Sequence, residues 1–412
     1  MSSTTRPIRP TRVPRLTRAA CLTLAAASLA LFALLGARAA GAQGSAASQG
    51  FGYPTAQLGS RAAATVGAFT EFDETTPLNP SALLGWRNAG VHFQYEPEFR
   101  TTEANGATIR SAVNRVPVVL AALPVGSRSV IALSLSTLLD RTWGTDVVDR
   151  RLVGAESLYV NEISSSDGGM NDIRIAGAFR VRDWLDVGVG AHAIVGLDRF
   201  NQTVTLSRTD PRTDTTKSTE FSPYGQSADI RFSGSAFSAG VTVRPNRHVA
   251  VALSARRGEN LTLTRRDSTL GTARVPDRLG AGVVWELVPR TTLAADADWT
   301  GWSSLASLSS QSKPQDALGL SIGVETPGPR FAGRALTLRG GFRHRELAYN
   351  APVSSAGGAP VFGQVKENAL GLGLSAPFAY DRALLQIYGQ RALRSVAAEK
   401  SFTFGVGISI RP

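Results

Sequence analysis

The sequence predicts an all-β protein: a transmembrane, antiparallel β-barrel of about 14 strands with an N-terminal segment inside it. Three observations lead to this fold class. Apolar side chains recur at every second position, the chain opens with an export signal, and short turns alternate with long polar loops. Residues 401–410 (SFTFGVGISI) show the pattern most clearly, because their large apolar side chains all fall on one face of a strand. In a lipid bilayer, only a closed barrel pairs every backbone group of such strands.

The first 42 residues have the pattern of a cleaved secretory signal. Five arginines precede position 19 without an acidic residue, an apolar core covers residues 19–36, and small residues at 40–42 supply a cleavage site. The alternative is a retained transmembrane anchor, since an apolar core of 18 residues is close to the length that spans a bilayer. Cys21, the only cysteine, falls in this segment, so we expect neither a disulfide nor a thiolate metal site in the mature chain.

The charge is that of an exported barrel rather than of a nucleic-acid-binding protein. The formal net charge is +12, and removal of six arginines with the signal leaves 38 basic and 32 acidic residues. Arginine outnumbers lysine by forty to four, but no basic run is dense enough to bind nucleic acid. Because no second long apolar run follows the signal, the sequence excludes a helical membrane protein.

Fourteen segments follow the two-residue period of a strand. They are residues 91–100, 116–125, 131–136, 173–182, 185–198, 230–243, 249–256, 279–286, 293–300, 318–325, 336–343, 370–375, 383–390 and 401–410. Ile194 is the one large apolar residue on a polar face of its segment. Ile230 and Phe232 are out of phase with Phe237, so we expect a bulge near Gly234 to shift the pattern by one residue.

The connections sort into two classes. Short turns lie near residues 124–128, 183–184, 245–247, 289–290, 327–334 and 377–381, and long polar loops lie near 101–111, 140–168, 199–226, 258–277, 303–315, 348–363 and 392–399. An even strand count with short turns on one side is typical of barrels in the bacterial outer membrane. Trp184 and Trp302 end strands, where interfacial aromatics belong. A soluble β-sandwich or propeller is the alternative, but its turns would not sort in this way.

The polar faces of the strands predict what lines the interior. Many inward residues carry opposite charges, so most are expected to brace the wall as ion pairs, because an unpaired buried charge is costly. Some arginines could instead hold an anionic head group through forked hydrogen bonds. The candidates are Arg174, Arg180, His192, Arg256, Arg339 and Arg343.

No pattern of catalytic residues stands out, and we expect a protein that is not an enzyme and has no cofactor. The four histidines are scattered without a metal-ligand spacing, so no metal site is predicted. A Ser–His hydrolase, as in outer-membrane phospholipases, is the alternative. It would need an inward serine beside His192.

Residues 43–88 lack the alternation of apolar and polar residues, so they are not expected to form strands of the wall. Arg61-Ala62, Gly67-Ala68, Asp73-Glu74 and the motif Asn79, Pro80, Ser81, Ala82 and Leu83 resemble the start of the long-chain fatty-acid transporter (FadL-like) family of outer-membrane proteins. Residues 276–278 with 298–303 are similar to a later family stretch. Two features depart from the family: the chain ends Ile410-Arg411-Pro412 without a terminal aromatic, and residues 62–64 replace its usual methionine and glycine pair.

The resemblance implies a fourteen-strand barrel (residues 89–412) whose lumen holds residues 43–88 as a hatch, with residues 1–42 as the signal. It also implies passive uptake of hydrophobic or amphipathic small molecules, fatty acids among them, with exit through the wall at a kinked strand. Expected partners are membrane lipid, lipopolysaccharide and the outer-membrane assembly machinery. Two other functions remain open: a PorV-like shuttle or scaffold that binds proteins through its long loops, and a general diffusion porin.

Overall fold

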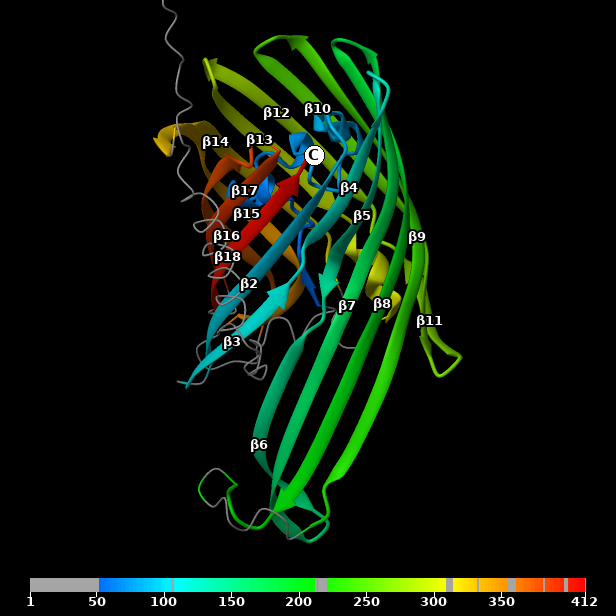
Figure 1. Cartoon of the computed structure of the whole chain (residues 1–412). Helices are drawn as coiled ribbons and strands as arrows, with labels where there is room; N and C mark the ends of the chain where they lie inside the picture. The colour runs from blue at the N-terminus through cyan, green and yellow to red at the C-terminus, as the bar shows by residue number, and fades with distance from the viewer. Residues whose placement is uncertain are drawn as a thin grey trace, which may run out of the picture. The chain divides into compact units, whose positions relative to one another are not determined.

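The computed structural model describes residues 52–411 except 105–106, 212, 214–220, 309–313, 332, 354–360, 381 and 396–398. The predicted signal and the start of the predicted hatch lie outside the described residues. The chain forms a closed, antiparallel, 14-stranded β-barrel, as predicted (Figure 1). Pairing of the last strand with the first wall strand closes it, with Phe402 opposite Phe99.

The strands are β1 (Tyr53–Pro54), β2 (Gly90–Ala104), β3 (Ala107–Arg115), β4 (Val118–Val125), β5 (Ser129–Asp140), β6 (Trp143–Val153), β7 (Glu156–Arg182), β8 (Leu185–Ser207), β9 (Tyr224–Asn246), β10 (Val249–Arg265), β11 (Ser268–Arg274), β12 (Arg278–Val288), β13 (Thr291–Thr300), β14 (Ala317–Phe331), β15 (Arg334–Val353), β16 (Val361–Phe378), β17 (Ala383–Arg394) and β18 (Glu399–Ile410). The helical elements are α3 (Ser60–Ala64), η1 (Thr70–Phe72), η2 (Pro80–Gly85) and η3 (Trp302–Leu308).

Three wall strands are interrupted, which explains why eighteen strands make a 14-stranded wall. β3 continues into β4, β5 into β6 and β11 into β12, each across a break of two or three residues. β1 lies inside and belongs to the N-terminal segment. Each of the fourteen predicted segments overlaps one strand of the wall.

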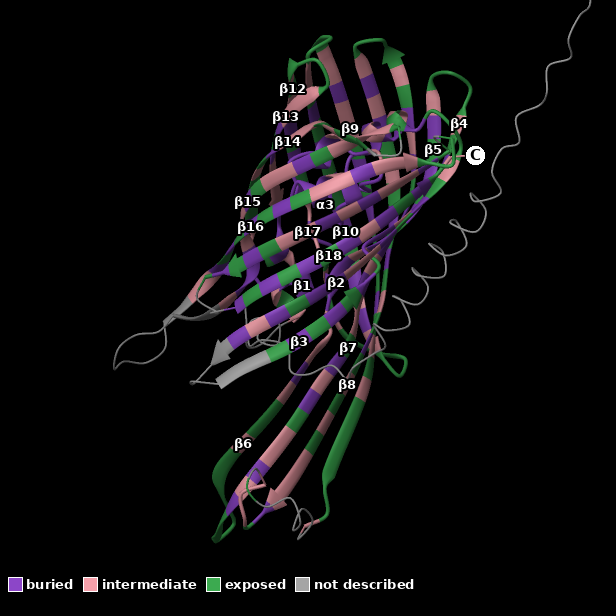
Figure 2. Ribbon diagram, turned by 60° about the vertical axis from the view of Figure 1, so that its left-hand side comes forward, coloured by how far each residue is buried: buried purple, intermediate pink, exposed green. Residues whose placement is uncertain are grey.

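The two faces of the wall differ as the sequence predicts. Figure 2 shows buried and exposed residues alternating along the strands. Outward side chains such as Ile175, Val189 and Leu372 are apolar and exposed. Inward side chains such as Gln94 and Asp186 are polar and buried. An apolar exterior around a polar, filled interior is the arrangement that a lipid bilayer requires of a β-barrel.

Two local predictions need correction. The β9–β10 ladder does shift register next to Gly234, between Gly258 and Leu261, but the extra residue lies on β10. β9 itself pairs with β8 without a shift from Val243 to Tyr224, so its side chains do not change faces as predicted. Ile230 and Phe232 simply lie on the inward side and join an apolar cluster inside the barrel. Trp302 belongs to the same cluster and is buried, whereas Trp184 is exposed at its turn as expected of an interfacial residue.

Several predicted long loops are strand extensions. Figure 1 shows β6, β7, β8 and β9 reaching beyond the rest of the wall, and the hairpin of β10 with β11 occupies most of residues 258–277. β6 escaped detection because most of its residues are exposed or half-buried on both faces. The β10–β11 hairpin escaped detection because its apolar residues, such as Leu261 and Leu263, are buried on the inner side. A strand outside the bilayer has no need of an apolar lipid face, so the two-residue period weakens there.

The wall divides between β3 and β6. β3 pairs with β2 and β6 pairs with β7, and no ladder joins β3 to β6 in the described part of the chain. β1 occupies the edge of β5 that is left free there, with Tyr53 opposite Asp140 and Pro54 opposite Leu139. Phe99, on β2 beside β3, points outward and is 45% exposed, so the gap begins within the apolar band.

Residues 52–88, called here the inner segment, fill the barrel. α3 contacts β15 to β18, η1 contacts β10 and β12, and η2 contacts β5 and β7 to β9, so the segment touches the wall around the bore. Among the described residues, no helix combines the length and apolar character needed to cross a membrane.

Candidate functional site

The Asn79–Leu83 motif builds the η2 turn of the inner segment. The Asn79 side chain accepts hydrogen bonds from the Ser81 backbone N–H (3.0 Å) and hydroxyl (2.8 Å), which caps η2. Its amide also donates to the Glu71 carbonyl (2.8 Å) and so ties η2 to η1. Leu83 is fully buried against wall residues such as Leu120. The motif therefore shapes and docks the inner segment.

Wall glycines make room for this motif. A Cβ at Gly188 would lie 2.5 Å from the Pro80 carbonyl carbon, and one at Gly240 would lie 2.0 Å from Asn79 Oδ1. Real Cβ atoms do not approach so closely, so larger residues would displace η2. These inward glycines thus accommodate a packed plug.

Two ion pairs bind the inner segment to wall strands, and a third joins Glu74 to Arg411, directly after β18, at 2.8 Å. Arg61, on α3, contacts Glu325 of β14 at 2.9 Å, and Glu325 also accepts from Arg339 at 2.6 Å. Glu71, on η1, accepts from Arg278 of β12 at 2.9 Å. Because these charges are largely buried, each pair holds the segment only as long as both partners remain in place.

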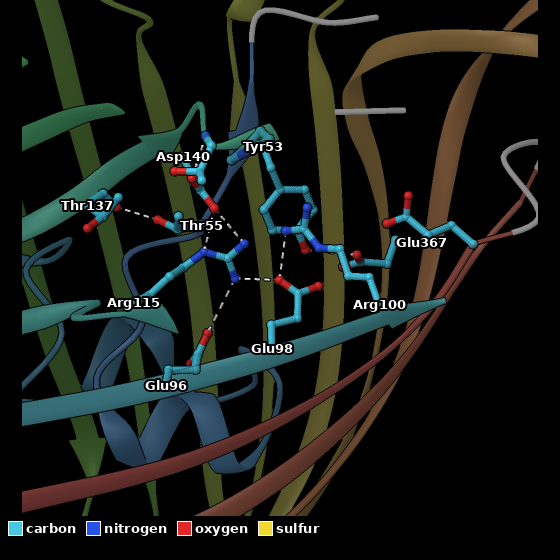
Figure 3. Close-up of polar contacts among 12 residues, drawn as sticks. Tyr53, Thr55, Glu96, Glu98, Arg100, Arg115, Thr137, Asp140 and Glu367 are labelled. Carbon is cyan, nitrogen blue, oxygen red and sulfur yellow. Dashed lines mark hydrogen bonds and ion pairs between the residues drawn. The ribbon is translucent and has the colours of Figure 1, made fainter. Parts of the chain in front are cut away.

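A larger charged cluster surrounds Tyr53 at the gap in the wall. Figure 3 shows the Tyr53 ring among side chains that come from several strands. The guanidinium groups of Arg100, Arg115, Arg345 and Arg394 lie 4.4–5.2 Å from the ring centroid. This distance is typical of cation–π contacts. β1 is therefore anchored by its first residue.

Buried carboxylates neutralise these arginines. Glu98 accepts from Arg100 (2.8 Å), Arg115 (2.5 Å) and Arg394 (2.9 Å). Glu367 accepts from Arg345 (2.7 Å), Arg394 (2.8 Å), Arg343 (3.3 Å) and the Tyr53 hydroxyl (2.9 Å). Arg115 also reaches Asp140 on β5 at 2.8 Å, so an ion pair crosses the place where the backbone ladder stops.

The structure places the six predicted head-group residues in four different surroundings. Arg180 pairs with Asp186 near a short turn, Arg339 with Glu325, and Arg343 with Glu367. Arg174, His192 and Arg256 come together on β7, β8 and β10. Arg256 contacts Asp172 (3.3 Å) and Gln57 (3.1 Å).

His192 lies in a hydrogen-bonded chain between a carboxylate and a serine. Its Nδ1 is 2.8 Å from Asp172 Oδ1, and its Nε2 is 2.8 Å from Ser238 Oγ. The inward serine that a hydrolase would need is thus present. Asp172 is shared with Gln57 and Arg256, however, and Ser238 is only 6% exposed. The same contacts join four neighbouring strands, β7 to β10, to the inner segment as a structural brace.

An apolar cluster lies inside the barrel. Met170, Ile194, Phe232, Trp302 and Leu305 are buried there. Beside it is a cavity of about 60 Å³, lined by apolar side chains such as Leu58, Leu138 and Leu347 and by Arg256, Arg278, Arg343 and Arg345. The volume holds about two waters. The lining also contains the carboxylates of Asp298 and Glu346, so the space combines apolar side chains with charges of both signs.

A second cavity lies at the end with the short turns, which we assign to the periplasm. Its volume is about 570 Å³, and its lining includes Leu84, Trp86, Arg180 and Arg244. Leu84 and Trp86 belong to the inner segment. The inner segment thus contributes to the lining of both cavities.

Sequence reasoning missed the residues around Tyr53. Glu98, Arg115, Glu367 and Arg394 lie on inward faces, which the two-residue period could have identified. Their meeting at Tyr53 depends on strand stagger and on a partner from the inner segment. Neither can be inferred from a single sequence.

No family model and no curated protein matches the sequence. Solved structures do match the fold. A FadL homologue of Pseudomonas aeruginosa has a TM-score of 0.55 at 12% identity, covering 87% of this chain and 99% of that one. The toluene transporter TodX of Pseudomonas putida has a TM-score of 0.54 at 13% identity, covering 87% and 98%. The monoaromatic hydrocarbon channel CymD has a TM-score of 0.52 at 13% identity, covering 86% and 97%.

The chain therefore has the fold of FadL-like outer-membrane barrels, which confirms the resemblance seen in the sequence. The closed wall and its apolar exterior fit the bacterial outer membrane, the predicted location. At this level of identity the likeness concerns the fold alone.

Proposed function

We propose that the protein is an outer-membrane channel for the passive uptake of hydrophobic or amphipathic small molecules, fatty-acid-like molecules among them, with the inner segment as its hatch. The observation that carries this proposal is the inner segment between two cavities, one of which joins apolar side chains to arginines. The structural neighbours with printed functions are hydrocarbon and toluene channels. A filled bore argues against a general diffusion porin.

The gap between β3 and β6 supports a sideways exit. β1 and the Arg115–Asp140 ion pair close the gap. β1 pairs with β5 at only two residues, and the ion pair is a contact between side chains, so neither is a full backbone ladder. Displacement of β1, whose Pro54 lines the smaller cavity, would open that cavity to the gap at the level of the lipid band. In this mechanism a hydrophobic molecule reaches the bilayer without crossing water, and its concentration gradient supplies the driving force.

The hatch proposal predicts a large change in conductance. Deletion of residues 43–88 from the mature chain should raise single-channel conductance in planar bilayers sharply, because the described part of this segment, residues 52–88, fills the bore. A fourteen-stranded barrel without a plug is wide enough for an aqueous channel. The conductance of the shortened barrel is compared with that of the wild-type barrel, with both proteins refolded in the same detergent.

A matched control is removal of the β10–β11 hairpin tip at Arg266–Asp267, which lies outside the lumen. This shortening should leave conductance unchanged. Equal conductance of the wild type and a folded barrel without residues 43–88 would refute the hatch.

Transport by this route uses no chemical step, so Ser238 should be unreactive. We expect a fluorophosphonate probe not to label the purified barrel, because Ser238 is buried and hydrogen-bonded to His192. Mass spectrometry of the intact protein measures the adduct. An adduct that disappears in Ser238→Ala would show a hydrolase instead.

A further inference from the structure

Exposed arginines surround the periplasmic end of the barrel. Each of the six short connections between wall strands carries one, either in the turn or in the last two residues of the strand before it. They are Arg128, Arg182, Arg247, Arg290, Arg330 and Arg382, called here the arginine ring. Alternate connections of an antiparallel barrel lie at the same end, so the six side chains are distributed around the wall.

The arginine ring is not neutralised within the protein. None of its six members forms an ion pair with another residue in the described part of the chain. Exposed arginines on the strand extensions behave differently: Arg151 pairs with Asp149 at 3.1 Å, and Arg208 pairs with Glu156 at 3.0 Å. The charge of the ring is therefore available to a molecule outside the barrel.

Few carboxylates accompany the ring. The six connections themselves hold two, Asp183 and Asp381, against six arginines. Asp186, close to the β7–β8 turn, is buried and already pairs with two further arginines of the wall at 2.9 and 2.5 Å. Glu286, near the end of β12, lies 3.4 Å from His248. The short connections thus carry a net positive charge, which attracts anions to this end.

The ring also lies at the border of the lipid-facing surface. Exposed apolar side chains continue to within two residues of it, as Val181 next to Arg182 and Val288 near Arg290 show. Three large aromatic side chains are exposed at the same end: Trp184, Trp285 and Tyr380. Tryptophan and tyrosine concentrate at the level of the lipid head groups. An arginine at this level can extend its charge into the head-group layer while its stem covers apolar surface.

This arrangement favours lipid over a protein partner. A ring around the whole barrel matches an occupant that also surrounds the barrel, whereas a protein would contact one side of it. Lipid phosphates are the anions at the head-group level, and a guanidinium binds a phosphate through two parallel hydrogen bonds. Basic side chains next to a leaflet with net negative charge are attracted to it, and a zwitterionic leaflet lacks this net charge.

We propose that the arginine ring binds anionic phospholipids in the leaflet that faces the periplasm. The guanidinium groups hold the phosphates, and the outward apolar side chains above them contact the acyl chains. The ring thereby selects the lipids around this end of the barrel and fixes its depth in the bilayer. The inference goes beyond the proposed channel and does not rest on it, because it requires only that the barrel spans a bilayer.

The test measures which lipids stay bound to the full mature barrel. The protein is reconstituted into bilayers of equal amounts of dioleoyl-phosphatidylglycerol and dioleoyl-phosphatidylcholine, extracted in a mild detergent and analysed for bound lipid by mass spectrometry. The two lipids share their acyl chains, so only the head group can discriminate. Phosphatidylglycerol should be enriched about fivefold, the factor expected for one arginine beside an anionic head group.

Two variants with the same net charge locate the effect. The ring variant changes all six members of the arginine ring to glutamine and should lose the enrichment. The control variant changes six exposed arginines of the strand extensions and their tips to glutamine: Arg150, Arg151, Arg208, Arg231, Arg265 and Arg266. It should retain the enrichment, because these side chains lie away from the periplasmic leaflet. Faster migration of the unheated protein on a gel shows that each barrel is folded.

A measurement on the wild type does not depend on the folding of any variant. Concentrated salt screens exposed charges, so it should reduce the enrichment during extraction. The proposal is overturned if the wild type shows no enrichment, if the enrichment withstands concentrated salt, or if both folded variants lose it equally. Poly-L-glutamate serves as the probe for an acidic protein partner. Its binding to a wild type that shows no lipid enrichment would assign the ring to a protein instead.

Discussion

Glu367→Gln is expected to destabilise the barrel by about 3–5 kcal/mol, the usual effect of removing one partner from a buried charge pair. Glu367 is the carboxylate on which Arg343, Arg345 and Arg394 converge, and its side chain is 1% exposed. Glutamine preserves the shape but leaves an excess positive charge beside Tyr53. The free energy of unfolding in lipid vesicles, measured by urea titration, checks the value.

Glu156→Gln is the matched control. Glu156 pairs with Arg208 at 3.0 Å on the strand extensions, where both side chains are more than half exposed. Exposed pairs contribute about 0–1 kcal/mol, so this change should be small. If the two variants lost the same stability, the cluster around Tyr53 would not be the anchor of β1.

The wall of this barrel could be predicted from the sequence because each strand needs apolar side chains on the face that contacts lipid. Phe402, Phe404 and Val406 alternate with small or polar residues, and this pattern correctly predicts strand β18. The same rule correctly located the short turns. It also placed His192 and Arg256 on inward faces.

The alternation rule fails wherever a strand does not have lipid on one face and a polar lumen on the other. Ile230 and Phe232 suggested a bulge, since the pattern assumes that apolar residues face outward. They face inward because Trp302 and Leu305 form an apolar region inside the barrel. β6 was missed for the complementary reason: both faces of an extension meet water.

The functional contacts were the least predictable. Alternation assigns Arg174 and Arg343 to the interior but cannot distinguish a free guanidinium from one paired with Glu367. That difference depends on strand stagger and on where the inner segment lies. Tyr53 illustrates this point, because its partners come from six wall strands that are distant in sequence.

The second large effect is expected from a disulfide that locks β1 against β5. Pro54 and Leu139 are direct antiparallel partners, and such residues have Cα atoms at the separation that a disulfide requires. The mature chain predicted here has no other cysteine. Under oxidation, a Pro54→Cys and Leu139→Cys double variant should lose uptake of toluene and oleate down to the background of cells without the channel. A reductant should restore it, since β1 is then free to leave the gap between β3 and β6.

Two further cross-links make the result specific. Ser81→Cys with Thr242→Cys would lock η2, because the two hydroxyl oxygens are 2.8 Å apart. Thr291→Cys with Thr326→Cys joins two wall strands whose hydroxyl oxygens are 2.9 Å apart and leaves the inner segment free. Uptake should survive both, because neither holds β1. Loss of uptake in the η2 lock but not in the β1 lock would mean that molecules pass straight through the bore, and the sideways route would have to be abandoned.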